Sequence, residues 1–170
     1  LSIGRHIERL GFLAASLELG FSTGSVHDAS GFEAMIALFD STITFHAQYQ
    51  QSHDVVALLD LLVMDRDNPR SLGWVAQTLR GRLARLAGSA PGELAALSLN
   101  VPNPDLWDLE DLCRTEMEHA PEPGPTTEQA PSTPLLQLLE QCTQSAYTVS
   151  DDISAVYFTH SGEAKQSLGV

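Results

Sequence analysis

The sequence predicts an all-α fold, an antiparallel bundle of five to six helices. Apolar side chains recur every three and four residues along most of the chain, which is the spacing of one helix face. They make up 43% of the 170 residues, which is enough to bury a core. No segment alternates polar and apolar residues as a half-buried strand does, and the short loops favour antiparallel neighbours.

The first predicted helix covers residues 2–19, and a loop rich in glycine and serine follows at 20–25. Asp28 or Ser30 can cap a second helix, whose apolar period continues to about Tyr49. The stripe that the first helix is expected to bury consists of Ile3, Ile7, Leu10, Ala14 and Leu17.

A third predicted helix starts at Val55 and is interrupted at residues 65–69. Asn68 suits the N-cap of the next helix, and Pro69 suits its first position, where the missing N–H of proline costs nothing. This helix is expected to end near Gly88, as a glycine at a helix C-terminus predicts. The arginines expected around the rim of its apolar face are Arg80, Arg82 and Arg85.

The C-terminal part has a weaker pattern until its last helix. Residues 94–99 predict a turn or two of helix, and 105–119 predict an acidic helix. Residues 120–133 contain four prolines and few apolar residues, so we expect a mobile linker there. A long helix is expected to begin near Pro134 and to end between Phe158 and Gly162, and residues 1–170 are treated as one helical domain.

The charge of the chain excludes some functions. Nine basic residues against twenty-two acidic ones give a formal net charge of −13. A nucleic-acid-binding protein needs a basic footprint to replace the counterions of the phosphates, and an anionic membrane surface requires the same. We therefore expect neither nucleic acid nor membrane among the partners.

The cellular location is expected to be the cytoplasm. No apolar run approaches the roughly 20 residues that span a bilayer, and the first residues lack the pattern of a signal peptide. The two cysteines, Cys113 and Cys142, have no metal-binding spacing and are expected to be free thiols. The chain starts without an initiator methionine, so it is expected to be part of a longer protein.

No cofactor or metal is expected. The stretch from Gly20 to Gly24 has neither the preceding strand nor the spacing of a nucleotide-binding loop, and the only lysine is Lys165. We therefore predict that the domain by itself neither binds nor hydrolyses ATP. The six histidines do not form the helical pairs that hold metal ions.

Two polar clusters are candidates for a site. Arg5, Glu8 and Arg9 lie on successive turns of the first helix, either as a solvated ion-pair face or as a clamp for an anion. Residues 65–71 are either a helix cap and loop brace or an anion site formed by a helix N-terminus with Arg70. We expect Arg9 to be partly buried and paired with Glu8 or with a carboxylate from residues 65–67, since a buried charge requires a partner.

In sequence order, residues 3–9, 45–49 and 62–71, followed by the Tyr-Phe-x-His of 157–160, resemble the bacterial alpha-E domain family. That family has a Gly-Arg-x-x-Glu-Arg helix, a Leu-rich helix and an Asn-Pro-x-Ser cap. The unit occurs once here, so the chain resembles the carboxy-terminal repeat of a duplicated domain. The resemblance and the clusters together nominate as ligand-binding residues Arg5, Glu8, Arg9, Tyr49, Asn68, Arg70, Ser71, Tyr157 and His160.

The resemblance implies that the domain assists an enzyme. Alpha-E domains are associated with circularly permuted ATP-grasp proteins, which implies such a protein or domain as partner, with a peptide or amino-acid substrate as a further ligand. The first hypothesis is an accessory or binding domain of an ATP-grasp-type amide or peptide ligase. The alternatives are an independent helical enzyme with an Arg/Glu site, and a protein-interaction module that docks through the acidic segment 105–128. Convergence of Arg5, Glu8, Arg9, Arg70 and Tyr157 in one pocket favours the first hypothesis or the enzyme, whereas their scattering over the surface favours the interaction module.

Overall fold

The computed structural model describes residues 2–50, 52–88, 96–114 and 133–157, with side chains up to Ala155 in the last segment. This part of the chain is all α-helical, as predicted, and contains no strand. Five of its helices have eight or more residues, and they are α1 (Ser2–Ser22), α2 (Ala29–Leu38), α3 (Thr42–Tyr49), α5 (Leu72–Leu86) and α8 (Pro134–Tyr157). The shorter elements are η1 (Ser25–His27), α4 (Val55–Leu59), η2 (Asp60–Met64), α6 (Ala96–Leu99), η3 (Pro104–Leu106) and α7 (Leu109–Cys113).

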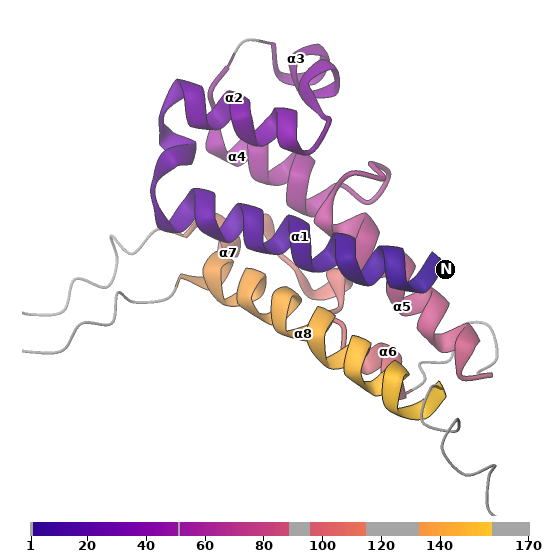
Figure 1. Cartoon of the computed structure of the whole chain (residues 1–170). Coiled ribbons are helices and arrows are strands. Elements are labelled where there is room, and N and C mark those ends of the chain that lie inside the picture. The colour runs from indigo at the N-terminus through magenta and orange to yellow at the C-terminus, as the bar shows by residue number, and fades with distance from the viewer. Residues whose placement is uncertain (1, 51, 89–95, 115–132, 158–170) are drawn as a thin grey trace, which may run out of the picture.

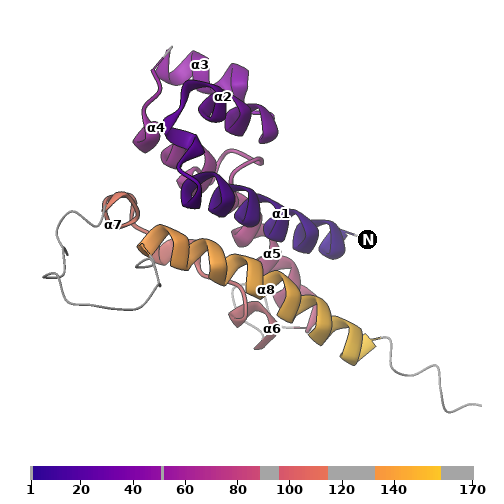
Figure 2. The ribbon, with the colours of Figure 1, turned by 60° about the vertical axis from the view of Figure 1, so that its left-hand side comes forward.

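Helices α1 and α8 form an antiparallel pair along one side of the molecule, and α5 packs against α1 from behind (Figures 1 and 2). A glycine makes the approach of α1 to α8 close, because a Cβ added to Gly11 would lie 3.3 Å from the Cβ of Ala146. The stripe predicted for α1 faces the core, where Leu10, Ala14 and Leu17 have no exposed surface. One side of α8 is buried against this core, with Leu135, Leu138, Leu139, Cys142, Ala146 and Val149, whereas Tyr147 is exposed.

The predicted second helix is in fact two. It breaks after Phe39, where Asp40 takes a left-handed conformation with φ 51°, and Ser41 starts α3. The buried Ser41 hydroxyl donates a hydrogen bond to the Phe39 carbonyl oxygen. The break lets Phe32 of α2 and Phe45 of α3 pack edge to face, with ring centroids 5.3 Å apart. Continuous three- and four-residue spacing through the break concealed it in the sequence.

The prediction that Asn68 is the N-cap of the next helix was wrong. Helix α5 starts at Leu72, and its N-cap is Ser71, whose side-chain oxygen accepts a hydrogen bond from the Trp74 N–H at 3.0 Å. The predicted end was right, because Gly88 follows the helix with φ 76°. At its start α5 touches the π-helical turn η2, since a Cβ on Gly73 would lie 2.8 Å from the Val63 carbonyl oxygen.

Other boundaries also differ from the prediction. Residues predicted as a loop from Gly20 to Ser22 belong to α1, where Gly20 is buried against Met35. Within the predicted acidic helix of 105–119, the described part to Arg114 contains only η3 and α7. The linker predicted at 120–133 lies outside the described residues except for Thr133, whose hydroxyl oxygen accepts a hydrogen bond from the Leu136 N–H at 3.2 Å. In the part of the chain that is described, no helix is both long and apolar enough to cross a bilayer.

Candidate functional site

The first polar cluster lies on the solvent side of α1. Arg5, Glu8 and Arg9 are all exposed, and within the described residues none of them makes an ion pair or a side-chain hydrogen bond. The expectation that Arg9 is partly buried and paired with a carboxylate was therefore wrong. The reason is its position on the helix, because α1 turns only the stripe around Leu10 and Leu17 towards the core.

Two large apolar side chains share this side of α1. Phe12 is 54% exposed and Leu19 is 65% exposed. A helix brings residues three, four and seven positions apart onto one face. We call the resulting stripe the α1 outer face, and its members are Arg5, Glu8, Phe12, Ala15 and Leu19, with Arg9 at its edge.

The second polar cluster is part of a brace that holds the turn between α4 and α5. The Tyr49 hydroxyl donates a hydrogen bond of 2.6 Å to the Asp60 carboxylate, which links α3 to η2. Burial, and then the hydrogen bond and charge of Asp60, raise the pKa of Tyr49 to about 12. The phenol is thus a neutral hydrogen-bond donor at physiological pH.

Asn68 and its neighbours use their polar atoms on the backbone. The buried Asn68 amide donates to the Leu61 carbonyl oxygen at 3.1 Å, and its own oxygen accepts from the Arg70 N–H at 3.0 Å. An Asp65 carboxylate oxygen accepts from the N–H groups of Asp67 and Asn68 at 2.9 and 3.2 Å. The Ser71 hydroxyl donates to the Asp65 carbonyl oxygen. These contacts fit the loop-brace interpretation of residues 65–71.

Arg70 is also occupied. Its Nε and Nη2 lie 2.9 and 2.7 Å from one carboxylate oxygen of Asp40, the residue at the break between α2 and α3. The same turn is tied to the C-terminal part of the chain by Arg66, which donates to the Asp105 carboxylate and to the Pro104 carbonyl oxygen. The guanidinium that one of the two interpretations placed at an anion site instead forms an ion pair within the protein.

The nominated residues therefore fall into two places. Tyr49, Asn68, Arg70 and Ser71 belong to the brace, whereas Arg5, Glu8 and Arg9 lie on the solvent side of α1, and no hydrogen bond or ion pair among the described residues joins the two groups. Of the remaining two, the Tyr157 backbone ends α8, and its side chain and all of His160 lie outside the described residues.

Sequence reasoning missed the role of Arg80. Its side chain is only 8% exposed, and its Nη1 donates to the Ser98 carbonyl oxygen at 3.0 Å and to that of Val101. Burial lowers the pKa of this guanidinium, and the charge of Asp105 opposes that change. The signal available was its position four residues after Ala76 and three before Leu83, both buried.

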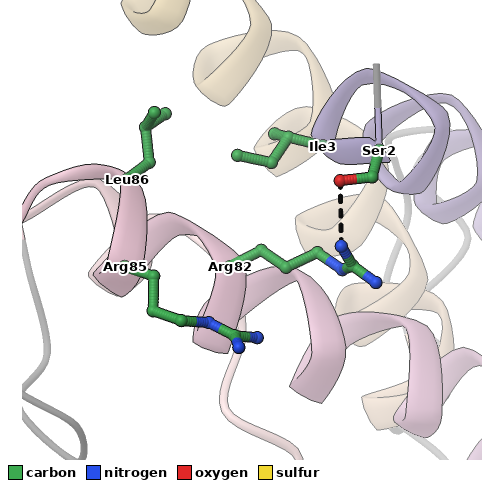
Figure 3. Close-up of a pocket in the computed structure, with 5 residues that line it drawn as sticks. All are labelled: Ser2, Ile3, Arg82, Arg85 and Leu86. Atoms are coloured by element: carbon green, nitrogen blue, oxygen red, sulfur yellow. Dashed lines mark hydrogen bonds between the residues drawn. The ribbon is translucent and has the colours of Figure 1, made fainter.

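The other two arginines of α5 border a pocket at the end of the bundle. Figure 3 shows Arg82 reaching towards the start of α1, where its Nη1 donates a hydrogen bond to the Ser2 hydroxyl at 2.9 Å. Arg85 lies beside it, and the apolar walls are Ile3 and Leu86. The sequence had placed both arginines at a rim, which is where they are.

Two of the histidines meet at Glu33 on α2. The Nε2 atoms of His46 and His53 each lie 3.5 Å from a different oxygen of this carboxylate. All three side chains are substantially exposed, so the arrangement is a surface cluster. Among the described residues no group of three or more His, Cys, Asp or Glu side chains is arranged to hold a metal ion.

Comparison with known proteins places the chain in a family. Two uncharacterized proteins, one from Mycobacterium bovis and one from Mycobacterium tuberculosis, are each 32% identical to it over 93 residues. The aligned part covers 53% of this chain and 10% of each relative, so the chain spans about a tenth of their length. No solved structure matches it.

The family model that matches residues 1–158 describes a predicted alpha-helical domain with a conserved ER motif. The sequence contains a single Glu-Arg dipeptide, Glu8-Arg9, and it lies on the solvent side of α1. The all-α fold agrees with the description. The chain therefore belongs to the Alpha-E family.

Proposed function

We propose that this domain is an accessory binding module of an ATP-grasp-type amide or peptide ligase system, and that it contacts its partner through the α1 outer face. The observation that carries the proposal is the exposure of Phe12 and Leu19 beside the family's Glu-Arg pair. Exposed single apolar residues are ordinary, but here they share a stripe with three charged residues that have no partner among the described residues.

The composition of the outer face suits a protein partner. Interfaces commonly have an apolar centre with a polar rim, and a helix face of this kind docks into a groove through anchors one or two turns apart. Burying a phenylalanine or leucine contributes about 1.5 to 3 kcal/mol, so Phe12 and Leu19 are the expected anchors. Arg5, Glu8 and Arg9 then set the orientation by charge.

The ligase partner follows from the resemblance of the sequence to domains associated with circularly permuted ATP-grasp proteins. The matching mycobacterial proteins support an accessory role, because the aligned region is only a tenth of each. A single enzyme site built from both polar clusters has less support, since Arg70 pairs with Asp40 and the Asn68 amide is bound to the backbone.

The proposal is tested by titrating the protein with a circularly permuted ATP-grasp protein from the same organism, using calorimetry and the rate of ADP release. Phe12→Asp is expected to weaken binding at least about tenfold, because it places a charge at an interface anchor. Ile43→Asp is the matched control. Ile43 is 87% exposed on α3, away from the outer face, so this variant should bind within about twofold of the unchanged protein.

Two outcomes contradict the proposal. Equal losses from Phe12→Asp and Ile43→Asp would remove the outer face as the contact, and no binding by the unchanged protein would remove the partner. Micromolar ATP binding by the domain alone would support the independent enzyme instead. Binding that is lost only on neutralising the acidic segment 105–128 would support the interaction module.

A further inference from the structure

One end of the bundle contains an open pocket of about 370 Å³ between the start of α1 and the last turns of α5. It is lined by Ser2, Ile3, Arg82, Arg85 and Leu86 (Figure 3). The volume is within the usual range for small-ligand sites, which is roughly 300 to 1,000 Å³. The lining combines two guanidinium groups and a hydroxyl with two aliphatic side chains.

The charge at this pocket is unusual for the chain. The sequence has 22 acidic residues and a net charge of −13, yet among the described residues neither Arg82 nor Arg85 has a carboxylate within salt-bridge distance. Two like charges three residues apart on a helix repel each other unless an anion lies between them. The pocket is thus a local basic region on an acidic protein.

The hydrogen-bond donors of Arg82 are only partly used. Its Nη1 donates to the Ser2 hydroxyl, while its Nε is buried and has no partner among the described residues. A buried donor without an acceptor lowers the stability of the fold. Arg85 folds back along α5 and donates from Nε to the Gly81 carbonyl oxygen at 3.2 Å, which leaves its terminal nitrogens free for a ligand.

We propose that this pocket binds a carboxylate that carries an aliphatic side chain. A guanidinium presents paired N–H donors that match the two oxygens of a carboxylate, and Ile3 and Leu86 supply apolar walls next to them. Two kinds of ligand present an α-carboxylate next to an aliphatic side chain: the C-terminus of a peptide and a free amino acid. The site is separate from the contact through Phe12 and does not depend on the ligase partner.

The charge of the chain favours a single negative charge in the pocket over a phosphate dianion. The pocket lies between the C-terminal end of α5, where the helix dipole is negative, and the start of α1, where it is positive, so the two helix ends act on an anion in opposite directions. The net charge of −13 penalises a dianion more than a monoanion.

The test is a titration of the protein with small ligands, in which binding is measured from the NMR signals of the arginine Nε–H groups. N-acetyl-leucine represents a peptide C-terminus, free leucine represents the amino acid, and N-acetyl-leucinamide is the neutral control. We expect saturable shifts of the Arg82 and Arg85 signals with at least one of the two carboxylates, and at least about tenfold weaker binding of the amide. The tighter of the two carboxylates identifies the source.

Variants place the binding in the pocket. Arg82→Gln and Arg85→Gln should each weaken carboxylate binding at least about tenfold, with the melting temperature measured as a control for folding. Arg114→Gln makes the same change in charge at the C-cap of α7, outside the residues that line the pocket, and should bind within about twofold of the unchanged protein. Equal binding of acid and amide, tighter binding of inorganic phosphate, or equal losses in all three variants would overturn the proposal.

Discussion

Two regions are both rich in polar residues: the brace, which consists of Tyr49, Asp60 and residues 65–71, and the α1 outer face. Most polar side chains of the brace have partners within the protein, and those of the outer face have none among the described residues. In the brace, Asn68, Arg70 and Ser71 all have partners inside the protein, mostly backbone groups. On the outer face, the charged side chains have no partner among the described residues, and Phe12 and Leu19 lie in solvent beside them. The two regions contain similar residue types, so they can be distinguished only by how far their side chains are buried and whether these form hydrogen bonds or ion pairs.

This difference distinguishes residues that stabilise the fold from residues that remain available to bind. A buried polar group is costly unless it is hydrogen-bonded, so its removal should lower stability through the acceptors or donors left behind. An exposed charge contributes little to folding, so its removal should change binding alone. Variants in the two regions should therefore separate stability from binding.

The largest loss of stability is expected from Arg80→Ala. Arg80 is buried and bonded to backbone carbonyl oxygens, as Asn68 is in the brace. The substitution removes the donor to the carbonyl oxygens of Ser98 and Val101 and leaves both buried without that partner. We expect the free energy of unfolding, measured with urea, to fall by about 2 to 4 kcal/mol. Arg85→Ala on the exposed side of α5 is the control, with a change within about 0.5 kcal/mol. Similar losses from Arg80→Ala and Arg85→Ala would show that the hydrogen bonds of Arg80 do not stabilise the fold.

Asn68→Ala is expected to come next, with a loss of about 2 kcal/mol. The change strands the Leu61 carbonyl oxygen and the Arg70 N–H, which the Asn68 amide satisfies together. The N-cap variant Ser71→Ala should cost less, about 1 kcal/mol, which is the usual loss for an N-cap serine. A larger loss for Ser71 than for Asn68 would mean that the cap, and not the amide, holds the turn.

Tyr49→Phe is expected to lower the free energy of unfolding by about 1 kcal/mol at neutral pH, the contribution of one hydrogen bond to Asp60. The raised pKa adds a pH dependence. The pKa of the unfolded phenol is near the ordinary value of 10.0 and that of the folded one is about 12, so the contribution is complete below about pH 10 and disappears as the pH rises to about 12.

The pH dependence of Tyr49 has to be measured as a difference between the unchanged protein and Tyr49→Phe, because Cys142 also makes the stability fall at alkaline pH. Burial raises the pKa of its thiol to about 12, so it also destabilises the fold at alkaline pH. The difference between the two proteins, followed by fluorescence from pH 8 to pH 12, isolates Tyr49. A difference that stays constant across this range would contradict a perturbed Tyr49.

Periodicity predicted much of the fold, because long helices leave a strong signal. The start of α1, the end of α5 near Gly88 and the start of α8 at Pro134 all followed from apolar spacing and local signals. The break between α2 and α3 did not, since the spacing continues through Ser41 and the break is determined by packing of Phe32 against Phe45.

The candidate site was harder to predict, because partners distant in sequence decide what a polar residue does. Arg80 is bound by carbonyl groups 18 and 21 residues further along, and Arg70 by a carboxylate 30 residues earlier. Asn68 and Ser71 are both good N-cap residues, and only the hydrogen bonds decide between them. Likewise, the apolar stripe of α1 did not reveal that Arg9 lies outside its buried side.

The smallest effect on stability is expected from Arg9→Ala on the outer face. Arg9 is exposed and has no carboxylate within salt-bridge distance among the described residues, so its removal strands no buried charge. Alanine also favours the helix slightly more than arginine does. We therefore expect the free energy of unfolding to change by less than about 0.5 kcal/mol, while affinity for the ligase partner falls. A loss of 2 kcal/mol or more would assign the Glu-Arg motif a structural role, and unchanged stability with unchanged binding would remove Arg9 from the contact surface.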